Sequence, residues 1–288
     1  MNDKIAIIGG DGMLGTEIVG LLNAHNFFCT SYDLPEFDIL DKQNLEKIVD
    51  EYDIIINSAA YTNVDEAESH IDTAEAVNAT ALGILGKFVA EYEKYVIHIS
   101  TDFVFGENAE KPLKETDHPS PLNTYGKTKL KGEQKLFATG CKTAIIRVQW
   151  TYGENGVNFI EKIIHRAKQT KSVTVVDDQW GAPTSTKDVA SAILKIMQKR
   201  SEGLFHYAAK GYTSRYDCAR FVLDKMNIDT KISRAKTADF DSPAQRPLNS
   251  RFDCSKIVAE IGPCQIPWQK SLQNYLKTME TTKNGKNI

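Results

Sequence analysis

Ile5-Ala6-Ile7-Ile8-Gly9-Gly10-Asp11-Gly12-Met13-Leu14-Gly15 lies at the start of a chain of 288 residues. A short apolar run leads directly into spaced glycines, and an amphipathic segment, Thr16–His25, follows them. This order is typical of a strand, a tight turn and a helix that bind a dinucleotide, because glycine lets the backbone approach a pyrophosphate at the positive end of the helix. The alternative interpretation is a glycine-rich turn without a ligand.

The glycines fit two registers of this motif. Gly10, Gly12 and Gly15 satisfy G-x-G-x-x-G, whereas Gly9, Gly12 and Gly15 satisfy the wider G-x-x-G-x-x-G. Both registers serve the same turn, so the sequence leaves the choice between them open.

The first half of the chain alternates short apolar runs with longer amphipathic stretches, which is the rhythm of a parallel sheet with crossover helices. The strands are expected at Ile5–Ile8, Phe28–Tyr32, Ile54–Asn57, Val96–Ser100 and Thr143–Val148. The helices are expected at Thr16–His25, Asn44–Glu51, Ile71–Glu91 and Asn123–Phe137. We therefore predict the α/β class, with a Rossmann-type doubly wound parallel sheet.

The pattern is less regular beyond Trp150. Helical stretches are expected at 159–168 and 185–199, and strands at 172–176 and 203–208, between turn-rich segments. We expect residues 1–150 to form a cofactor-binding Rossmann domain and residues 151–288 to form mainly a smaller substrate-binding domain. The segments near 185–208 are expected to return to the Rossmann sheet.

Composition narrows the classes of function. The chain is 41% hydrophobic and 25% charged, with a formal net charge of −3, so we expect neither a disordered chain nor a nucleic-acid partner. The five cysteines include no Cys-x-x-Cys pair, and the six histidines show no spacing typical of ligands, so we expect no metal site and treat the histidines as structural or surface residues. No run approaches the roughly 20 apolar residues that cross a bilayer. A cytoplasmic protein is expected.

Asp33 ends the second expected strand, about 20 residues after the glycine loop, where an acid can accept hydrogen bonds from an adenosine ribose. An acid there repels a 2′-phosphate, which favours NADH over NADPH. The alternative is a solvated aspartate in a turn. Asp38 and Ile39 lie at a later bend and are expected to flank the adenine.

Tyr125 and Lys129 form a Y-x-x-x-K pair in a predicted helix, and a spacing of four places both on one face. A phenol has a pKa near 10, and we expect the lysine ammonium to lower it so that the tyrosine can act as a proton donor. The alternative is a surface tyrosine beside an extended lysine.

Thr101 belongs to Ser100-Thr101-Asp102, at the carboxyl end of an expected strand, where ligands sit in open α/β sheets. Its hydroxyl can hydrogen-bond a substrate carbonyl beside Tyr125, although a capping role is the alternative. Threonine, tyrosine and lysine together suit the reduction of a carbonyl, with a hydride from a nicotinamide and a proton from Tyr125.

Six separated segments resemble the extended short-chain dehydrogenase/reductases and, within them, the dTDP-4-dehydrorhamnose reductase family. The resemblance covers almost the whole chain. The segments are Asn57-Ser58-Ala59-Ala60-Tyr61-Thr62-Asn63-Val64-Asp65, Ser100-Thr101-Asp102-Phe103-Val104-Phe105, Tyr125-Gly126-Lys127-Thr128-Lys129, Trp150-Thr151-Tyr152-Gly153, Asp178-Gln179-Trp180-Gly181-Ala182-Pro183-Thr184 and Arg246-Pro247-Leu248-Asn249-Ser250.

The resemblance implies a reductase that uses NADPH or NADH to convert the 4-keto group of dTDP-6-deoxy-L-lyxo-4-hexulose to the alcohol, giving dTDP-L-rhamnose for polysaccharides. It implies a catalytic triad of Thr101, Tyr125 and Lys129. It also implies a cofactor site that Lys129 shares with Gly12, Met13, Leu14, Asp33, Asp38, Ile39, Ala59, Ala60, Tyr61 and Ile99. The sugar nucleotide would contact Thr101, Asp102 and Trp150. Arg246 would pair with its diphosphate or, alternatively, form a structural salt bridge.

Two departures from the family pattern bear on the site. Gln149 follows Arg147-Val148 where the family commonly has serine, so we expect an altered pocket wall. Some members dimerise through magnesium held by carboxylates. Glu17 matches one of these, but Lys187 stands where another is needed and opposes a cation, so we expect no metal and a monomer or weak homodimer.

Three other functions stay open at this point. A dehydratase of this superfamily typically has a glutamate where this chain has Phe103, which has no proton to give. An epimerase, or another reductase of nucleotide-linked keto-sugars, would keep the fold and the cofactor. A regulatory subunit that binds NAD(P) without catalysis would also keep the fold, but it would not need Thr101, Tyr125 and Lys129.

Overall fold

The computed structural model describes residues 3–106 and 111–285. Its centre is a six-stranded sheet with the order β10-β5-β4-β3-β1-β2, in which every neighbouring pair is parallel. The strands are β1 (Ile5–Ile8), β2 (Cys29–Tyr32), β3 (Ile54–Asn57), β4 (Tyr95–Thr101), β5 (Lys142–Val148) and β10 (Gly203–Tyr207). The chain runs from β1 outward to β2. It then crosses to the opposite side of β1, where β3 lies, and continues outward from there through β4, β5 and β10. The predicted doubly wound sheet is therefore confirmed.

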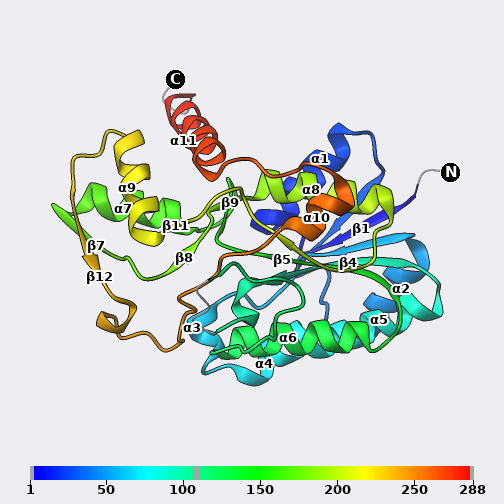
Figure 1. Cartoon of the computed structure of the whole chain (residues 1–288). Helices are drawn as coiled ribbons and strands as arrows, with labels where there is room; N and C mark the ends of the chain where they lie inside the picture. Colours follow the sequence, from blue (N-terminus) through cyan, green and yellow to red (C-terminus); the bar gives the residue numbers. More distant parts are fainter. Residues whose placement is uncertain (1–2, 107–110, 286–288) are drawn as a thin grey trace.

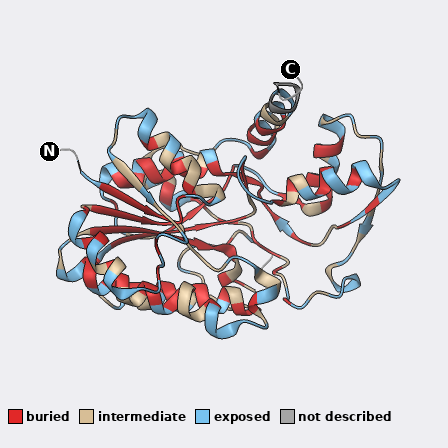
Figure 2. Cartoon of the chain, turned by 180° about the vertical axis from the view of Figure 1, so that it is seen from behind, coloured by how far each residue is buried: buried red, intermediate tan, exposed pale blue. Residues whose placement is uncertain are grey.

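Helices cover both faces of this sheet, and the strands between them are buried (Figures 1 and 2). Alternate residues of β1 enter two separate cores because successive side chains of a strand point to opposite faces. Ile5 and Ile7 pack in the core that includes α1 (Met13–Ala24) and α8 (Thr186–Lys199). Ala6 and Ile8 pack in the core formed with α2 (Lys42–Glu51), α5 (Ala81–Glu91) and the end of α6 (Thr124–Phe137).

The single helix expected over residues 71–91 is wrong in detail. This stretch contains α4 (Ile71–Glu75), the π-helical turn η1 (Ala76–Thr80) and then α5. The side chain of Asn78 in η1 accepts a hydrogen bond from Tyr61 N at 2.9 Å and donates to Thr128 Oγ1 at 3.1 Å. A π turn widens the helix locally, and here it directs a buried amide toward the loop after β3 and toward α6.

A smaller lobe follows β5 and the short pair β6 (Thr151–Tyr152) and β9 (Thr184–Ser185). Two parallel strands, β7 (Ser172–Val176) and β12 (Lys231–Ala235), lie beside α7 (Phe159–Gln169) and α9 (Arg215–Lys225) at the end of the molecule away from the central sheet (Figure 1). Antiparallel β8 (Trp180–Gly181) and β11 (Thr213–Ser214) complete the lobe. Between these segments the chain crosses back to the central sheet, where β10 pairs with β5.

The remaining elements connect the two lobes or cover the sheet. They are α3 (Val64–Ala67), the 3-10 turns η2 (Asp102–Val104) and η3 (Thr237–Asp239), α10 (Ser255–Ile261) and α11 (Trp268–Gly285). Over the described ranges, no helix combines the length and apolar character that a bilayer crossing demands. The division near residue 150 stays a prediction, because the chain passes between the lobes more than once.

Candidate active site

The glycine loop is shaped by two close approaches of backbone. Gly9 has φ +79°, and a Cβ there would lie 2.5 Å from Ala59 N at the end of β3. A Cβ on Gly15 would lie 2.1 Å from Gly9 O, so the start of α1 packs directly on the turn. A Cβ on Gly12 would meet only Gly9 O, at 3.3 Å, because this residue faces a cleft. Gly10 packs against Ser31 instead. Of the two registers, Gly9, Gly12 and Gly15 is therefore the one that lines the cleft.

This cleft lies along the carboxyl ends of β1, β3 and β4 and has a volume of about 870 Å³. It brings together residues that are far apart in the sequence, and it includes every residue that we expected at the cofactor or in the triad. They are Gly9, Gly12, Met13, Leu14, Gly15, Asp33, Asp38, Ile39, Ala59, Ala60, Tyr61, Ile99, Thr101, Tyr125 and Lys129. The side-chain-free cradle at Gly12 and the adjacent helix N-terminus fit the diphosphate of a dinucleotide.

Asp33 lies where β2 ends, beside the glycine loop. Its Oδ2 accepts a hydrogen bond from Asp11 N at 3.0 Å, and its Oδ1 accepts one from Leu34 N at 2.9 Å. The carboxylate is thus held at the cleft by two backbone amides. Asp38 also lines this end of the cleft, with the buried side chain of Ile39 beside it.

Tyr125 lies in the first turn of α6, next to Thr101 at the end of β4. Asn123 caps this helix through Oδ1, which accepts from Gly126 N at 2.8 Å. A Cβ on Gly126 would lie 2.1 Å from Phe103 O, so glycine lets the helix start pack directly on η2. The Tyr125 ring meets that of Phe103 edge-on, with 5.6 Å between centroids. This packing places the phenol and the Thr101 hydroxyl on the same side of the cleft.

The pKa of Tyr125 differs from what the spacing led us to expect. Burial raises it to about 12, while a hydrogen bond with Thr101 acts in the opposite direction. Lys129 does not lower it, because Nζ is directed toward β4. It donates to Ile99 O at 2.7 Å and lies 3.1 Å from His98 Nε2. Burial lowers the pKa of Lys129 itself to about 8, against the opposing charge of Glu133.

A buried ion pair next to Lys129 was not predicted. Glu133, one helical turn after the lysine, accepts hydrogen bonds from Arg147 Nη2 at 2.6 Å and Nε at 2.9 Å, and a further one from Ser100. Arg147 also stacks on Phe105. His98, one of the histidines that we treated as structural or surface residues, is fully buried and in contact with Lys129.

A second cleft, of about 900 Å³, opens beside the first in the smaller lobe. The two clefts share Phe103, Trp150, Val157 and Arg215. The Arg215 guanidinium lies 3.7 Å from the centroid of the Trp150 ring and 4.8 Å from that of Phe159, an arrangement that holds its charge at the junction. Sequence reasoning missed this residue.

Three more basic side chains line the second cleft, namely Lys162, Arg166 and Arg246. Lys162 and Arg166 are one turn apart on α7, which places them on one face. Arg246 donates to Asp65 Oδ2 at 2.7 Å and to Ala244 O at 3.0 Å, so it forms the salt bridge that was one of its two expected roles. It also lowers the pKa of Asp65.

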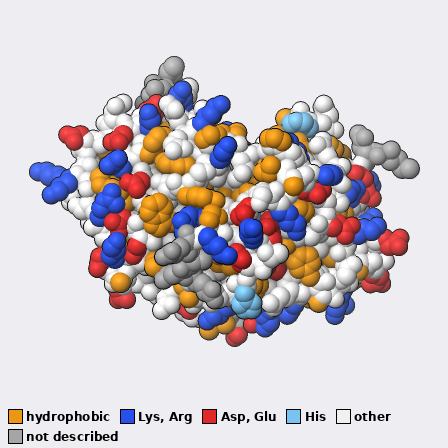
Figure 3. All heavy atoms as spheres, in the orientation of Figure 1, with side chains coloured by type: hydrophobic (Ala, Val, Ile, Leu, Met, Phe, Trp, Pro, Cys, Tyr) orange, Lys and Arg blue, Asp and Glu red, His pale blue; other side chains and the backbone are white. Residues whose placement is uncertain are grey.

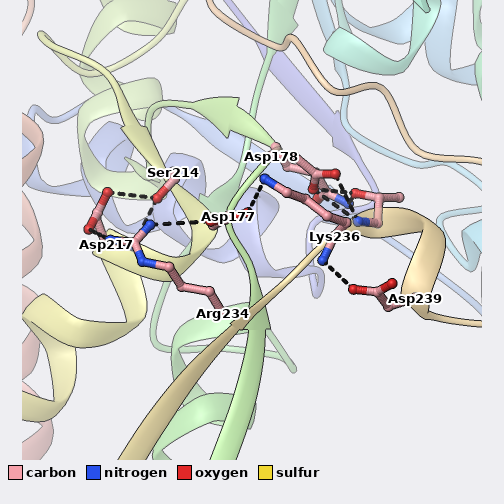
Figure 4. Close-up of polar contacts among 9 residues, drawn as sticks. Asp177, Asp178, Ser214, Asp217, Arg234, Lys236 and Asp239 are labelled. Carbon is pink, nitrogen blue, oxygen red and sulfur yellow. Dashed lines mark hydrogen bonds and ion pairs between the residues drawn. The ribbon is translucent and has the colours of Figure 1, made fainter.

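Residues 237–248 line part of the second cleft, and side chains at and near both ends of this segment bond it to the two lobes. Figure 4 shows its beginning, where Lys236 pairs with Asp177 at 2.8 Å and Arg234 binds the same carboxylate at 3.3 Å. Asp178 accepts from the backbone and hydroxyl of Thr237, which lines the cleft. The Asp65–Arg246 pair fixes the other end to the cofactor side.

Asp102 links the lobes at the site itself. Its Oδ2 accepts a hydrogen bond from Ser250, and its Oδ1 accepts one from Thr101 at 3.2 Å. Burial raises the pKa of this carboxyl to about 6, with the hydrogen bond from Ser250 and the Arg215 charge opposing the rise. Trp150, with φ +45°, lines both clefts directly after β5.

The two departures from the family pattern have clear places in the structure. Gln149 lines the first cleft, and its Oε1 accepts from Ala182 N at 2.9 Å, which fixes the loop behind Trp150. Lys187 Nζ lies 2.5 Å from Glu154 Oε1, and its charge also acts on Glu17, whose pKa is raised by burial. Within residues 3–106 and 111–285, no group of three His, Cys, Asp or Glu could hold a metal ion. On the face drawn in Figure 3, acidic and basic side chains are interspersed.

Comparisons with known proteins agree with this geometry. The model of the RmlD substrate binding domain family matches residues 3–281. The dTDP-4-dehydrorhamnose reductase of Aggregatibacter actinomycetemcomitans is 33% identical over 94% of this chain and 97% of its own. A crystal structure of a dTDP-4-dehydrorhamnose reductase from Clostridium acetobutylicum is 35% identical, with a TM-score of 0.93 over 96% of this chain and 99% of its own. That of Bacillus anthracis, solved in complex with NADP, is 30% identical, with a TM-score of 0.92 over 96% of this chain and 100% of its own. The chain therefore belongs to the dTDP-4-dehydrorhamnose reductase family.

Proposed function

We propose that this protein reduces the 4-keto group of dTDP-6-deoxy-L-lyxo-4-hexulose with NADPH or NADH to give dTDP-L-rhamnose, a polysaccharide precursor. The observation that carries the proposal is the position of Thr101 and Tyr125. Both line the first cleft, next to the residues that line both clefts, such as Phe103 and Trp150. A dinucleotide in the first cleft and a nucleotide sugar in the second would thus meet at a proton donor. The family relationship supports the same substrate class.

Each member of the triad has a chemical role in this proposal. A nicotinamide cofactor in the first cleft would supply the hydride. Thr101 would donate a hydrogen bond to the substrate carbonyl, and Tyr125 would give its hydroxyl proton to the oxygen as negative charge develops there. A phenol that stays protonated at neutral pH, as burial ensures here, is ready to donate. Lys129, as an ammonium, would stabilise the phenolate that remains.

The cofactor would lie along Gly9, Gly12 and Gly15, with its adenosine ribose at Asp33 and its adenine near Asp38 and Ile39. The other expected contacts are those of the cleft walls, namely Met13, Leu14, Ala59, Ala60, Tyr61, Ile99, Tyr125 and Lys129. The backbone amides of Asp11 and Leu34 hold the Asp33 carboxylate at this end of the cleft, which supports its proposed position beside the ribose.

The sugar nucleotide would contact Thr101, Asp102 and Trp150 at its reacting end. Arg215 would bind its diphosphate, because the guanidinium lies at the junction of the clefts and is held there by the rings of Trp150 and Phe159. Arg246 would contribute from the far wall while it remains bound to Asp65. Lys162 and Arg166 extend the same basic lining.

The alternatives are distinguished by the site. A dehydratase is disfavoured because Phe103 fills the position beside Tyr125 with a ring that carries no acidic proton. A different keto-sugar reductase or an epimerase would use the same clefts, and a regulatory subunit would need only the first. Cytoplasmic location and a monomeric or weakly dimeric state stay predictions from the sequence.

The test is a spectrophotometric assay of NADPH and NADH oxidation, with the dTDP-4-keto-6-deoxy-L-sugar generated in situ. We expect one equivalent of reduced cofactor to be consumed for each dTDP-L-rhamnose formed. An epimerase would interconvert sugars without net oxidation of the cofactor. A regulatory subunit would bind the cofactor and turn over no keto-sugar, which would refute the proposal.

A further inference from the structure

A pair of buried side chains lies behind Lys129, on the side away from the cleft. His98 Nε2 is 3.1 Å from Lys129 Nζ, and His98 Nδ1 is 3.2 Å from Asn57 Nδ2. Asn57 and His98 are both fully buried, at paired positions of β3 and β4. In a water-excluded chain of this kind, each proton must have a definite place.

The orientation of Asn57 decides where the proton of His98 is. Asn57 Oδ1 accepts a hydrogen bond from Ala59 N at 3.1 Å, so the amide NH₂ is the group that faces the imidazole. His98 Nδ1 must then accept a hydrogen bond. Because a neutral imidazole carries one proton, that proton lies on Nε2 and is directed at Lys129. A doubly protonated ring would oppose the NH₂ of Asn57. Burial lowers the pKa of His98 and outweighs a hydrogen bond with the Asn57 backbone, which acts in the opposite direction.

An ammonium at Lys129 has no lone pair to accept the proton of His98, whereas a neutral amine has one. We propose that Asn57 and His98 hold Lys129 as a neutral amine in the cofactor-free protein. In this state Nζ accepts from His98 Nε2 and donates to Ile99 O, and its other hydrogen is left for the cleft.

The charged groups around Lys129 permit this state. Glu133 on α6 favours the ammonium, but its carboxylate already binds Arg147 from β5 and Ser100 from β4. Tyr125 on α6 stays protonated. Asp102, which follows β4, is bonded to Thr101 and Ser250. Burial lowers the pKa of Lys129 to about 8, and the hydrogen bond from His98 lowers it further, so the neutral amine predominates at pH 8.

The consequence for function rests on the proposed function of the cleft. A negatively charged cofactor favours a positive charge beside it, so Lys129 would take up a proton from the solvent when the cofactor binds. The proton of His98 would then move to Nδ1, and the carboxamide of Asn57 would turn to accept it. Ala59 N permits this turn because it also donates to Ile8 O at 3.1 Å. The ammonium that stabilises the Tyr125 phenolate would thus form only after the hydride source is in place. His98 and Asn57 are positioning residues in this scheme.

The first test uses the cofactor-free protein and is independent of its activity. Nitrogen-15 NMR of histidine-labelled protein at pH 8, with His98→Gln to identify the signal, should show Nε2 protonated and Nδ1 unprotonated. Carbon-13 NMR of labelled lysine should show a neutral amine for the signal that Lys129→Met removes, with Lys127→Met as the exposed control on the same helix. An imidazole protonated on Nδ1, or an ammonium at Lys129, would overturn the proposal.

The second test removes the group that fixes the tautomer. In Asn57→Leu the imidazole can move its proton to Nδ1, so we expect the titration midpoint of Lys129 to rise by about one pH unit or more, a factor of ~10. Calorimetry of NADH binding in buffers of different ionisation enthalpy should show proton uptake by the wild type and less by the variant. An unchanged lysine titration in a folded variant would contradict the role of Asn57. Absence of NADH binding would instead contradict the function proposed for the cleft.

Discussion

Asp102→Asn tests whether the carboxyl that links the two lobes is held against its preferred ionisation. The side chain is 2% exposed, and burial raises its pKa from 3.8 to about 6 although two hydroxyl groups donate to it. Asparagine has a similar shape, can still accept the Ser250 hydroxyl and has no charge to bury. The substitution therefore changes the pH dependence of stability more than the packing.

The sign and size follow from the difference between the folded and unfolded states. The folded protein holds this proton more tightly, so between about pH 4 and pH 6 it binds more protons than the unfolded chain, and its free energy of unfolding falls as the pH rises. The two pKa values are about two pH units apart, and each unit corresponds to about 1.4 kcal/mol, so the carboxyl costs about 3 kcal/mol above pH 6. The asparagine side chain would escape this cost, so the variant should gain on the wild type across the window.

Urea unfolding followed by tryptophan fluorescence, at intervals from pH 4 to pH 8, measures this difference. We expect the free energy of unfolding of Asp102→Asn, relative to the wild type, to rise by about 3 kcal/mol between the two ends. Asp50→Asn, which removes an exposed carboxyl on α2, controls for the loss of one negative charge. A difference that stays flat, or that falls as the pH rises, would refute the assignment of Asp102 as a destabilised buried carboxylate.

Three further predictions follow from other parts of the structure. Arg147→Met leaves the buried Glu133 carboxylate without its charged partner, so the free energy of unfolding in urea should fall by about 3–5 kcal/mol. The double variant Glu133→Leu/Arg147→Met should recover most of that loss, and equal stability of the wild type and the single variant would contradict this prediction. Asp33→Ser removes an acid from the ribose end of the cleft, so the ratio of the NADPH and NADH dissociation constants should shift toward NADPH by about tenfold, and an unchanged ratio would show that Asp33 does not face the ribose. Gly9→Ala should abolish NADH binding or folding, because its Cβ would clash with Ala59 N and its φ is positive. Gly20→Ala, whose Cβ meets nothing within 4 Å, should leave both intact. Calorimetry measures NADH binding and thermal unfolding measures stability, and a Gly9→Ala variant that behaves like the wild type in both would contradict the prediction.

Features of the fold and site that depend on neighbouring residues could be predicted from the sequence. The turn after β1 requires glycine at Gly9 because of its positive φ and at Gly15 because Gly9 O lies against it, and both requirements are local to this stretch of sequence. Tyr125 and Lys129 are likewise related by helix geometry alone. Even so, the direction of the lysine side chain toward β4 depends on His98, and the spacing could not indicate it.

Contacts between distant segments could not be predicted. Arg215 reaches the junction of the clefts because α9 begins beside Trp150, and no local pattern marks it as different from other helical arginines. Ser250 bonds Asp102 across 148 positions of the chain. The π turn at η1 was missed because the sequence pattern there is that of a regular helix, and the hydrogen bonds that hold the buried amide of Asn78 come from distant segments.

The most direct test of the central claim is the turnover of Tyr125→Phe with the dTDP-4-keto-sugar and reduced cofactor. Phenylalanine keeps the ring that packs on Phe103 and removes only the hydroxyl. If Tyr125 is the proton donor, kcat should fall by about 10²–10⁴-fold while the dissociation constant for NADH stays within a few-fold of the wild type. A variant that binds NADH and reduces the keto-sugar at the wild-type rate would show that the proton comes from elsewhere.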